Sequence, residues 1–245
     1  TLFLIFFKNI AKIINIYDIP SERKIHKKPV PILGGLLIYI NLIIFIYFSN
    51  FFEVSLNDTL YLENIKSVLL FFFTTSSIFL LGLIDDKIDL SPNIRVIFLS
   101  LLIINHLYFD NNLLIEELTF SFLDLNLKLN KISFMFTFFC IIVFIISANM
   151  FDGTNLQSSS FFIFILIYIS ITNLNLNIFC IFLVVSIIFF SIKNLKGKTF
   201  LGDGGSYLLS FILAYMLILT HKYTNIKSDE IAILIIFPII DTLRL

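Results

Sequence analysis

Long apolar runs separated by short polar segments dominate the chain. Runs such as residues 161–167 are apolar on every side, whereas a helix on the surface of a soluble protein keeps one polar face. A membrane-spanning helix needs roughly 20 mostly apolar residues. The pattern therefore predicts an all-α, polytopic transmembrane helix bundle with about nine spans. We expect them near residues 1–16, 33–52, 64–84, 94–109, 133–148, 157–172, 178–192, 206–221 and 230–245.

One polar connection, residues 110–132, has a different pattern from the others. Its segment Glu116–Leu127 partly alternates polar and apolar residues, and a period of two is typical of strands. We expect a short β-hairpin there. The chain begins without methionine inside one apolar run and ends just after another. We therefore expect residues 1–245 to form a single integral membrane domain that is truncated at both ends.

Composition and charge narrow the class of protein. Hydrophobic residues make up 58% of the chain and charged residues 14%, against roughly 25% charged residues in soluble domains. The formal net charge is zero, so nothing indicates a nucleic-acid-binding protein, which usually carries a basic face. Cys140 and Cys180 both lie inside apolar runs, and no disulfide is expected.

Counting the expected spans divides the polar segments between two membrane faces. The first face receives residues 17–31, 85–93, 149–156, 193–205 and the C-terminal end; the second receives 53–63, 110–132, 173–177 and 222–229. Twelve Lys and Arg residues fall on the first face and five on the second. Positive charge is concentrated in cytoplasmic loops, so the first face is expected to be cytoplasmic.

Three acidic segments all fall on this first face: Leu83–Asp86, Asn149–Gly153 and Phe200–Ser206. Carboxylates near hydrocarbon are costly and suggest function. Asp85 and Asp86 are adjacent, and neighbours on a helix point in different directions. One could face a metal ion and the other a substrate proton, although a solvated helix end would also account for them.

The second and third acidic segments combine carboxylates with glycine. Asn149 and Asp152 are three residues apart, so on a helix they would share a face. In Gly202–Ser206 a glycine-rich turn precedes an apolar run, and such a helix N-terminus offers N–H groups to an anion. Asp203 is suited to hold Mg²⁺ beside a phosphate. A helix break and an ordinary turn are the plain structural alternatives.

Basic residues on the same face could bind phosphate. Arg23, Lys24 and His26 lie in a strongly basic loop, and Arg95 follows the Asp85–Asp86 pair. Guanidinium groups bind phosphate through charge-assisted hydrogen bonds. Concentration of positive charge on the cytoplasmic side would also explain these residues.

Taken together, the motifs resemble those of the polyprenyl-phosphate N-acetylhexosamine-1-phosphate transferases. The first loop resembles that family's D-x-P-x-x-R-K-x-H…P-x-P-x-x-G-G pattern, and later segments resemble an aspartate-rich motif, N-x-x-D-G, F-x-G-D-x-G-S and a P…D…R motif. The matching residues are Asp18, Pro20, Arg23, Lys24, His26, Pro29, Pro31, Gly34, Gly35, Asp85, Asp86, Asp89, Leu90, Ser91, Asn149, Asp152, Gly153, Phe200, Gly202, Asp203, Gly205, Ser206, Pro238, Asp241 and Arg244.

The resemblance implies an enzyme of the bacterial inner membrane with a cytoplasmic active site. Such an enzyme transfers a sugar 1-phosphate, here expected to be N-acetylhexosamine 1-phosphate, from a UDP-sugar to undecaprenyl phosphate. It releases UMP and initiates a cell-surface glycan such as O-antigen. The implied cofactor is Mg²⁺, with Mn²⁺ as the alternative ion. The implied partners are the lipid phosphate, the UDP-sugar and the membrane, and a homodimer is left open.

The resemblance also assigns roles to residues. Asp85 or Asp86 is expected to accept a proton from the lipid phosphate, and Asp152 completes the expected catalytic set. Asp203 and Asp152 are expected to bind the metal. The expected substrate-binding residues are Arg23, Lys24, His26, Arg95 and Asn149.

The sequence departs from the family pattern beside the second acidic segment. Ile146 stands where many relatives have Asn, and Asn155 where many have a second Asp; an amide cannot act as a base. Three alternatives stay open. One is a proton- or cation-coupled transporter, whose carboxylates should lie near mid-membrane. The others are the phospho-MurNAc-pentapeptide branch and a CDP-alcohol phosphotransferase, whose Ala-Arg pair is missing after Gly153.

Overall fold

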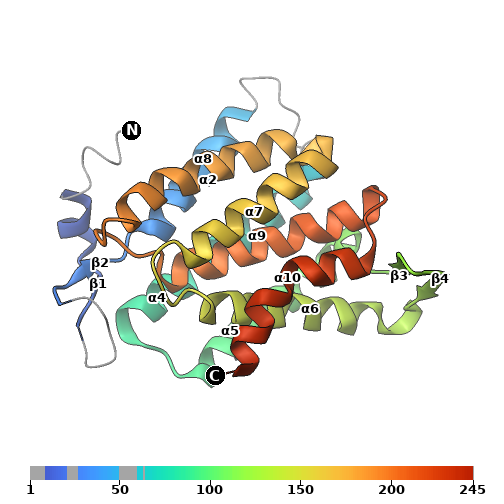
Figure 1. The fold of residues 1–245 in the computed structure, drawn as a ribbon, viewed down its shortest axis with the longest axis horizontal. Coiled ribbons are helices and arrows are strands. Elements are labelled where there is room, and N and C mark those ends of the chain that lie inside the picture. Colours follow the sequence, from blue (N-terminus) through green and yellow to red (C-terminus); the bar gives the residue numbers. More distant parts are fainter. Residues whose placement is uncertain (1–8, 21–26, 50–59, 63, 245) are drawn as a thin grey trace.

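The computed structural model describes residues 9–20, 27–49, 60–62 and 64–244. Within these residues eight long helices form a bundle (Figure 1). They are α2 (Gly34–Ser49), α4 (Ile65–Ile88), α5 (Pro92–Phe109), α6 (Ser133–Met150), α7 (Gln157–Thr172), α8 (Asn177–Asn194), α9 (Gly202–Tyr223) and α10 (Ser228–Arg244). The short 3₁₀ helices are η1 (Asn111–Leu113), η2 (Asn130–Ile132) and η3 (Leu174–Leu176).

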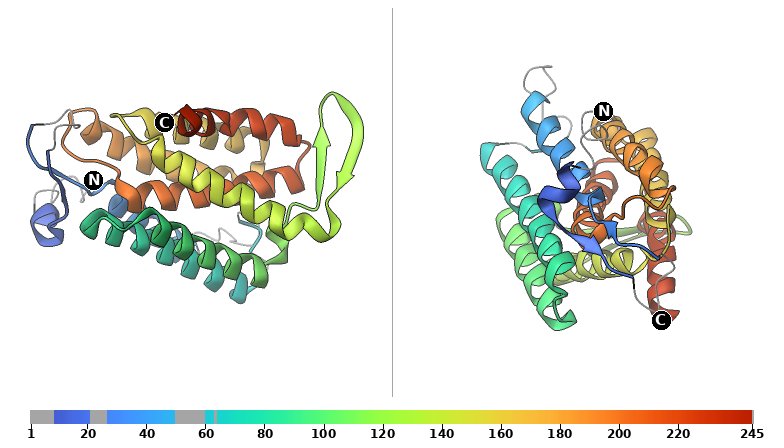
Figure 2. Two further views of the ribbon diagram at one scale, coloured as in Figure 1. Left: turned by 90° about the horizontal axis from the view of Figure 1, so that it is seen from below. Right: turned by 90° about the vertical axis from the view of Figure 1, so that its left-hand side faces the viewer.

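Helix α9 occupies the centre of the bundle, as the end-on view in Figure 2 shows. Every residue from Gly204 to Thr220 is buried, and α2, α4, α6 and α7 all pack against this helix. A helix that is enclosed all round needs no polar face, which explains why its sequence is apolar on every side beyond the first turn. The end of α9 that carries Asp203 is therefore held rigidly by its neighbours.

Among the described residues, five helical segments are long and apolar enough to cross a membrane. They are Ile65–Ile88, Pro92–Phe109, Asn130–Met150, Leu174–Asn194 and Gly202–Tyr223. Two shorter apolar helices, Gly34–Tyr47 and Gln157–Thr172, accompany them. The expected number of about nine spans is thus not confirmed by the described residues. Helix α10 has 17 residues and includes Asp229, Glu230, Asp241 and Arg244, and residues 1–8 of the expected span 1–16 fall outside the description.

Two small antiparallel sheets lie at opposite ends of the bundle. Strands β3 (Glu117–Phe120) and β4 (Leu123–Lys128) form the hairpin that the alternating pattern of residues 110–132 predicts. Strands β1 (Tyr17–Asp18) and β2 (Val30–Pro31) form the second sheet. The prediction of an all-α bundle with one hairpin therefore lacks the sheet β1–β2. Strands of two residues are too short to produce a recognisable period-two pattern in the sequence.

Glycines bring three helices into backbone contact at the end of the bundle near β1 and β2. A Cβ atom on Gly82 of α4 would lie 2.4 Å from the Cα atom of Gly204 in α9. A Cβ atom on Gly35 of α2 would lie 2.4 Å from the backbone nitrogen of Gly205. Because no side chain fits at these places, α2 and α4 approach the first turn of α9 more closely than any other residue would allow.

Candidate active site

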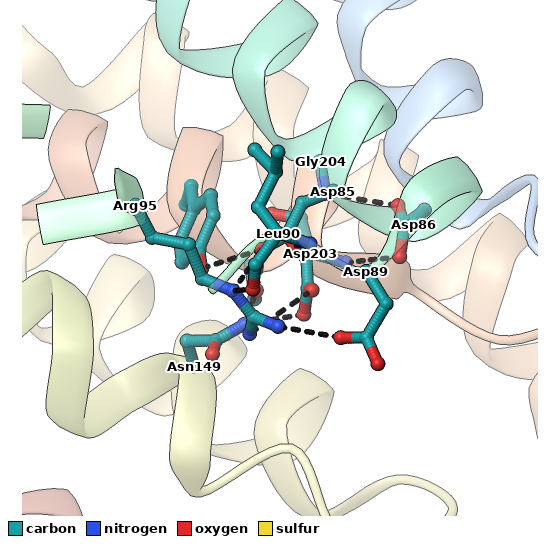
Figure 3. Close-up of polar contacts among 10 residues, drawn as sticks. Asp85, Asp86, Asp89, Leu90, Arg95, Asn149, Asp203 and Gly204 are labelled. Atoms are coloured by element: carbon teal, nitrogen blue, oxygen red, sulfur yellow. Dashed lines mark hydrogen bonds and ion pairs between the residues drawn. The ribbon is translucent and has the colours of Figure 1, made fainter. Parts of the chain in front are cut away.

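The acidic segments meet at one end of the bundle, where α4 and α6 end and α5 and α9 begin (Figure 3). The hairpin β3–β4 lies at the other end, where His221 near the C-terminus of α9 contacts the carbonyl oxygen of Glu117. Residues from four helices, with Asp89 from the connection after α4, thus form one polar cluster. We call it the acidic cluster: Asp85, Asp86, Asp89, Arg95, Asn149 and Asp203.

Asp86 caps the N-terminus of α9. Its Oδ1 atom accepts a hydrogen bond from the backbone N–H of Asp203 at 2.8 Å, and its Oδ2 atom accepts one from Gly204 at 3.1 Å. A carboxylate is favoured here because the first N–H groups of a helix have no partner within the helix and carry partial positive charge. Gly202 has a φ of +79°, and a Cβ atom there would lie 2.6 Å from Asp86 Oδ2. Glycine thus allows the cap to form.

Asp85 points away from Asp86 and is enclosed by three partners. Its side chain is fully buried. Oδ1 accepts a hydrogen bond from the backbone N–H of Leu90 at 2.9 Å, while Oδ2 accepts one from the hydroxyl of Tyr207 at 3.1 Å. Oδ2 also lies 3.0 Å from Nε of Arg95. A buried carboxylate needs such compensation, and Asp85 receives it from α5, α9 and the connection between α4 and α5.

The guanidinium of Arg95 lies between Asp85, Asp89 and Asp203. Nε donates to the carbonyl oxygen of Leu90 at 2.7 Å, and Nη2 donates to Oδ1 of Asp89 at 2.7 Å. Nη1 lies 3.9 Å from Oδ2 of Asp203. Arg95 is 24% exposed at its side chain, so the cluster presents a positive charge that an anion can reach.

Asp203 is held by an amide from another helix. Nδ2 of Asn149, near the end of α6, lies 2.7 Å from both Oδ1 of Asp203 and Oγ of Ser206. The carboxylate of Asp203 is nevertheless 29% exposed. Its Oδ2 atom lies 3.9 Å from Nη1 of Arg95, which is beyond hydrogen-bond distance.

Asp152 lies on the connection between α6 and α7, beside the cluster. Its Oδ1 atom accepts a hydrogen bond from the hydroxyl of Ser158, in the first turn of α7. Burial raises the pKa of Asp152 to about 6, and the Ser158 hydrogen bond partly opposes this rise. Asp152 is also close enough to Asp86 for their charges to interact.

Asn194, the last residue of α8, fixes the connections around the acidic cluster. Its Oδ1 atom accepts a hydrogen bond from the backbone N–H of Leu156 at 2.8 Å, and its Nδ2 atom donates to the carbonyl oxygen of Thr199 at 2.9 Å. Thr199 in turn donates to the carbonyl oxygen of Pro31 at 2.9 Å. The connections that carry Asp152 and precede Asp203 are thereby joined to the strand β2.

The carboxylates of the cluster suit a Mg²⁺ site better than a metal site built from three or more protein side chains. The described residues contain no group of three or more His, Cys, Asp and Glu side chains placed to hold a metal ion. Mg²⁺ does not require such a group, because it commonly uses one or two carboxylates together with water and substrate phosphate. The carboxylate of Asp203, which is 29% exposed, fits this type of donor set; Asp152, which lies near Asp86, is the second carboxylate predicted for it.

Comparison with known proteins identifies the family. The profile of glycosyl transferase family 4 matches residues 68–221, a range that holds Asp85, Asp86, Arg95, Asn149 and Asp203. The chain belongs to glycosyl transferase family 4. This family membership confirms the relationship that the motifs of the sequence indicate.

Individual relatives within glycosyl transferase family 4 share about a quarter of their residues with this chain. It is 27% identical to the undecaprenyl-phosphate alpha-N-acetylglucosaminyl 1-phosphate transferase of Escherichia coli O157:H7, over 98% of this chain and 65% of the relative. It is 25% identical to the protein of that name from Salmonella typhi, over the same shares. The Pasteurella multocida protein is 27% identical, over 99% and 68%. The chain thus spans about 65% of the length of the first two relatives.

The structure brings most of the predicted site residues of this family 4 chain together. Asp85, Asp86, Arg95, Asn149 and Asp203 form the acidic cluster, and Asp152 lies beside it. The roles assigned to them from the sequence stay predictions. The predicted substrate-binding residues Arg23, Lys24 and His26 lie outside the described residues.

Sequence reasoning did not name Tyr207, and it placed Ser206 in the F-x-G-D-x-G-S motif without giving it a site role; both side chains contact the cluster. Ser206 contacts Asn149, and Tyr207 contacts Asp85. Both follow Asp203 at helical spacings of three and four residues, which place side chains on one face. That spacing is the signal that could have identified them.

Proposed function

We propose that the full-length protein transfers an N-acetylhexosamine 1-phosphate from a UDP-sugar to undecaprenyl phosphate, at the cytoplasmic face of the bacterial inner membrane. A phosphate oxygen of the lipid forms a bond to the phosphorus that carries the sugar. The bond from this phosphorus to the UMP oxygen breaks, and UMP leaves. The lipid diphosphate sugar that results would start a cell-surface glycan. N-acetylglucosamine is the first sugar to test, because the relatives named above carry it in their names.

The observation that carries this proposal is the placement of Arg95 beside Asp203. An accessible guanidinium and an accessible carboxylate 3.9 Å apart provide a positive group for phosphate and a hard oxygen for a divalent cation. Family membership supplies the reaction type, since the relatives are named as 1-phosphate transferases. Phosphoryl transfer depends mainly on positioning and on compensation of negative charge; Arg95, together with a divalent cation held by Asp203, would supply that compensation.

The residues of the cluster divide this work. Arg95 would donate hydrogen bonds to a phosphate oxygen and offset charge on the UMP leaving group. Asp203 and Asp152 would hold Mg²⁺, which when bound compensates the charge of the diphosphate. Asn149 orients the Asp203 carboxylate through its 2.7 Å hydrogen bond.

The identity of the proton acceptor stays a prediction. The sequence predicts that Asp85 or Asp86 accepts the proton, yet either carboxylate would first have to lose hydrogen bonds that it now accepts. Both oxygens of Asp86 accept backbone hydrogen bonds from α9, and both oxygens of Asp85 accept hydrogen bonds as well. We propose that these two residues act chiefly by holding α9 and Arg95 in place.

The position of the cluster supports an enzyme over the transporter alternative. Its carboxylates lie at helix ends and connections, in the last turns of α4 and the first turn of α9. A transporter would be expected to carry its coupling carboxylates near the middle of the membrane.

The proposed function is tested with the full-length protein in membranes supplied with undecaprenyl phosphate. A panel of radiolabelled UDP-sugars is offered with Mg²⁺, with Mn²⁺ or with EDTA. We expect UMP release and a labelled lipid product that require both the lipid phosphate and the divalent ion. A folded full-length protein that releases no UMP from any donor would overturn the proposal.

A further inference from the structure

We infer that Tyr207 is a positioning residue of the proposed transfer reaction, and that it acts by fixing the guanidinium of Arg95 through the carboxylate of Asp85. This inference rests on the proposed function and adds a residue to it. Tyr207 lies one turn after Asp203 on α9, so both residues point from the same helix face towards the acidic cluster.

The contacts of Tyr207 are confined to the interior. The residue is 2% exposed, and its hydroxyl donates to Oδ2 of Asp85 at 3.1 Å. The same oxygen lies 3.0 Å from Nε of Arg95. A single carboxylate oxygen therefore accepts a hydrogen bond from Tyr207 and faces the positive charge of Arg95, so any shift of this oxygen affects both contacts.

The remaining contacts of Arg95 show what this arrangement achieves. The Nε and Nη2 atoms are directed by Leu90 and Asp89, and Asp89 is 95% exposed. The Nη1 atom faces Asp203 at 3.9 Å, which is longer than the roughly 2.7–3.2 Å of a hydrogen bond. Nη1 can therefore donate to a phosphate oxygen beside Asp203 (Figure 3). Asp85 is the buried anchor that keeps it there.

Removal of the Tyr207 hydroxyl is expected to make the Asp85 carboxylate less firmly held without creating a cavity in the core. Phenylalanine keeps the ring and removes the hydrogen bond from Tyr207 to Asp85 Oδ2, the oxygen that lies beside Arg95. A hydrogen bond to a charged group is stronger than one between neutral groups. Its loss should appear in part as a less ordered guanidinium, and so as slower transfer.

The test is a double-mutant cycle with Tyr207→Phe and Arg95→Lys in the full-length protein. We expect Tyr207→Phe alone to lower kcat about tenfold, with KM for the UDP-sugar changed far less, because Arg95 acts on charge that develops during transfer. Lysine has neither the Nε group that lies beside Asp85 nor the Nη1 group that faces Asp203, so in the Arg95→Lys background Tyr207→Phe should cause little further loss. A full tenfold further loss in that background would overturn the inference, because independent effects add.

Tyr215 provides the matched control. It lies on the same helix, is 1% exposed and donates through its hydroxyl to the carbonyl oxygen of Leu60 at 3.2 Å. Tyr215→Phe thus removes one buried hydrogen bond from α9 away from the acidic cluster. We expect near wild-type kcat and KM; a tenfold fall in kcat would mean that loss of any buried α9 hydroxyl slows the enzyme, and would overturn the inference.

Two further results separate the inference from the proposed function. A wild-type protein without UMP release fails the proposed function itself, whereas an active wild type with additive mutants fails the Tyr207 inference alone. If Tyr207→Phe does not fold, as judged by gel filtration and thermal unfolding, Tyr207→Met replaces it in the same cycle, because the flexible methionine side chain can fill the space of the ring and also lacks the hydroxyl. Coupling to Arg95→Lys supports the inference in that case too, and additivity overturns it.

Discussion

Asn149, near the C-terminus of α6, donates a hydrogen bond to Oδ1 of Asp203, in the first turn of α9, at 2.7 Å. The two residues are 54 positions apart in the chain, and this contact joins two of the acidic segments. We predict that Asn149→Ala lowers kcat/KM for the UDP-sugar by about tenfold or more, because an unpaired carboxylate loses its orientation. Asn93→Ala, an exposed change at the start of α5, should leave transfer unchanged; equal loss in both variants would contradict the role of Asn149.

Asp203→Asn tests the metal assignment. The amide retains the size of the side chain and an oxygen that can accept from Asn149, but it is a much weaker ligand for Mg²⁺. We expect the variant to lose Mg²⁺-dependent UMP release and to remain folded by thermal unfolding. Asp229→Asn removes a carboxylate at the hairpin end of the bundle, where Asp229 accepts from Ser121, and should retain full activity. Wild-type turnover by Asp203→Asn would refute the assignment.

Asp86→Ala should destabilise the protein through loss of the α9 cap. The two backbone N–H groups that donate hydrogen bonds to Asp86 would lose their acceptor. Loss of a side-chain cap costs about 0.5–2 kcal/mol. Thermal unfolding in detergent should show a lower Tm for this variant. Lys87→Ala changes an exposed residue in the same turn of α4 and serves as the control. An unchanged Tm for Asp86→Ala would show that the cap contributes nothing.

Gly82→Ala should move α4 away from α9. The added Cβ atom would lie 2.4 Å from Cα of Gly204, and backbone atoms cannot rotate aside as a side chain would. We expect a marked fall in Tm together with loss of transfer. Gly153→Ala is the matched control, because the nearest atom to its Cβ would be Oε1 of Gln157 at 3.9 Å; its Tm should stay close to wild type. A Gly82→Ala protein as stable as wild type would disprove the close packing.

The burial of Asp152 predicts a pH dependence of stability. Burial raises the pKa of Asp152 to about 6, above the roughly 3.9 expected in an unfolded chain. Its contribution to stability is therefore complete below about pH 4 and is lost as pH rises through about 6. In EDTA, Asp152→Asn should raise Tm relative to wild type at pH 8 but not at pH 4. The same difference in Tm at both pH values would contradict this account.

The sequence predicts the helices more reliably than the contacts of the site. Apolar runs locate α4, α5, α6, α8 and α9, because a long apolar helix carries its own signal in composition. The alternation of polar and apolar residues also locates the hairpin β3–β4. No such signal exists for strands of two residues, and β1–β2 was accordingly not foreseen.

Within the site, the sequence places residues at one end of the bundle without fixing their partners. Adjacency of Asp85 and Asp86 on a helix already implies that they face different ways, and the structure directs one to Arg95 and the other to α9. Which donors meet them depends on how α9 is rotated and how far it slides along α4. Tertiary packing sets both quantities, so the contact from Tyr207 to Asp85 is absent from any local pattern.

The backbone contacts at Gly82 and Gly35 have a consequence for how the acidic end tolerates sequence change. Main-chain atoms act there as spacers of fixed thickness, so the gap between α4 and α9 does not depend on which apolar side chains fill the rest of the bundle. Exposed apolar residues such as Phe98, Ile97 and Leu101 of α5 could be exchanged for others without changing that gap. The distance from Asp86 to the N-terminus of α9 therefore does not depend on which apolar residues the rest of the chain uses, even in a chain with 31 phenylalanines.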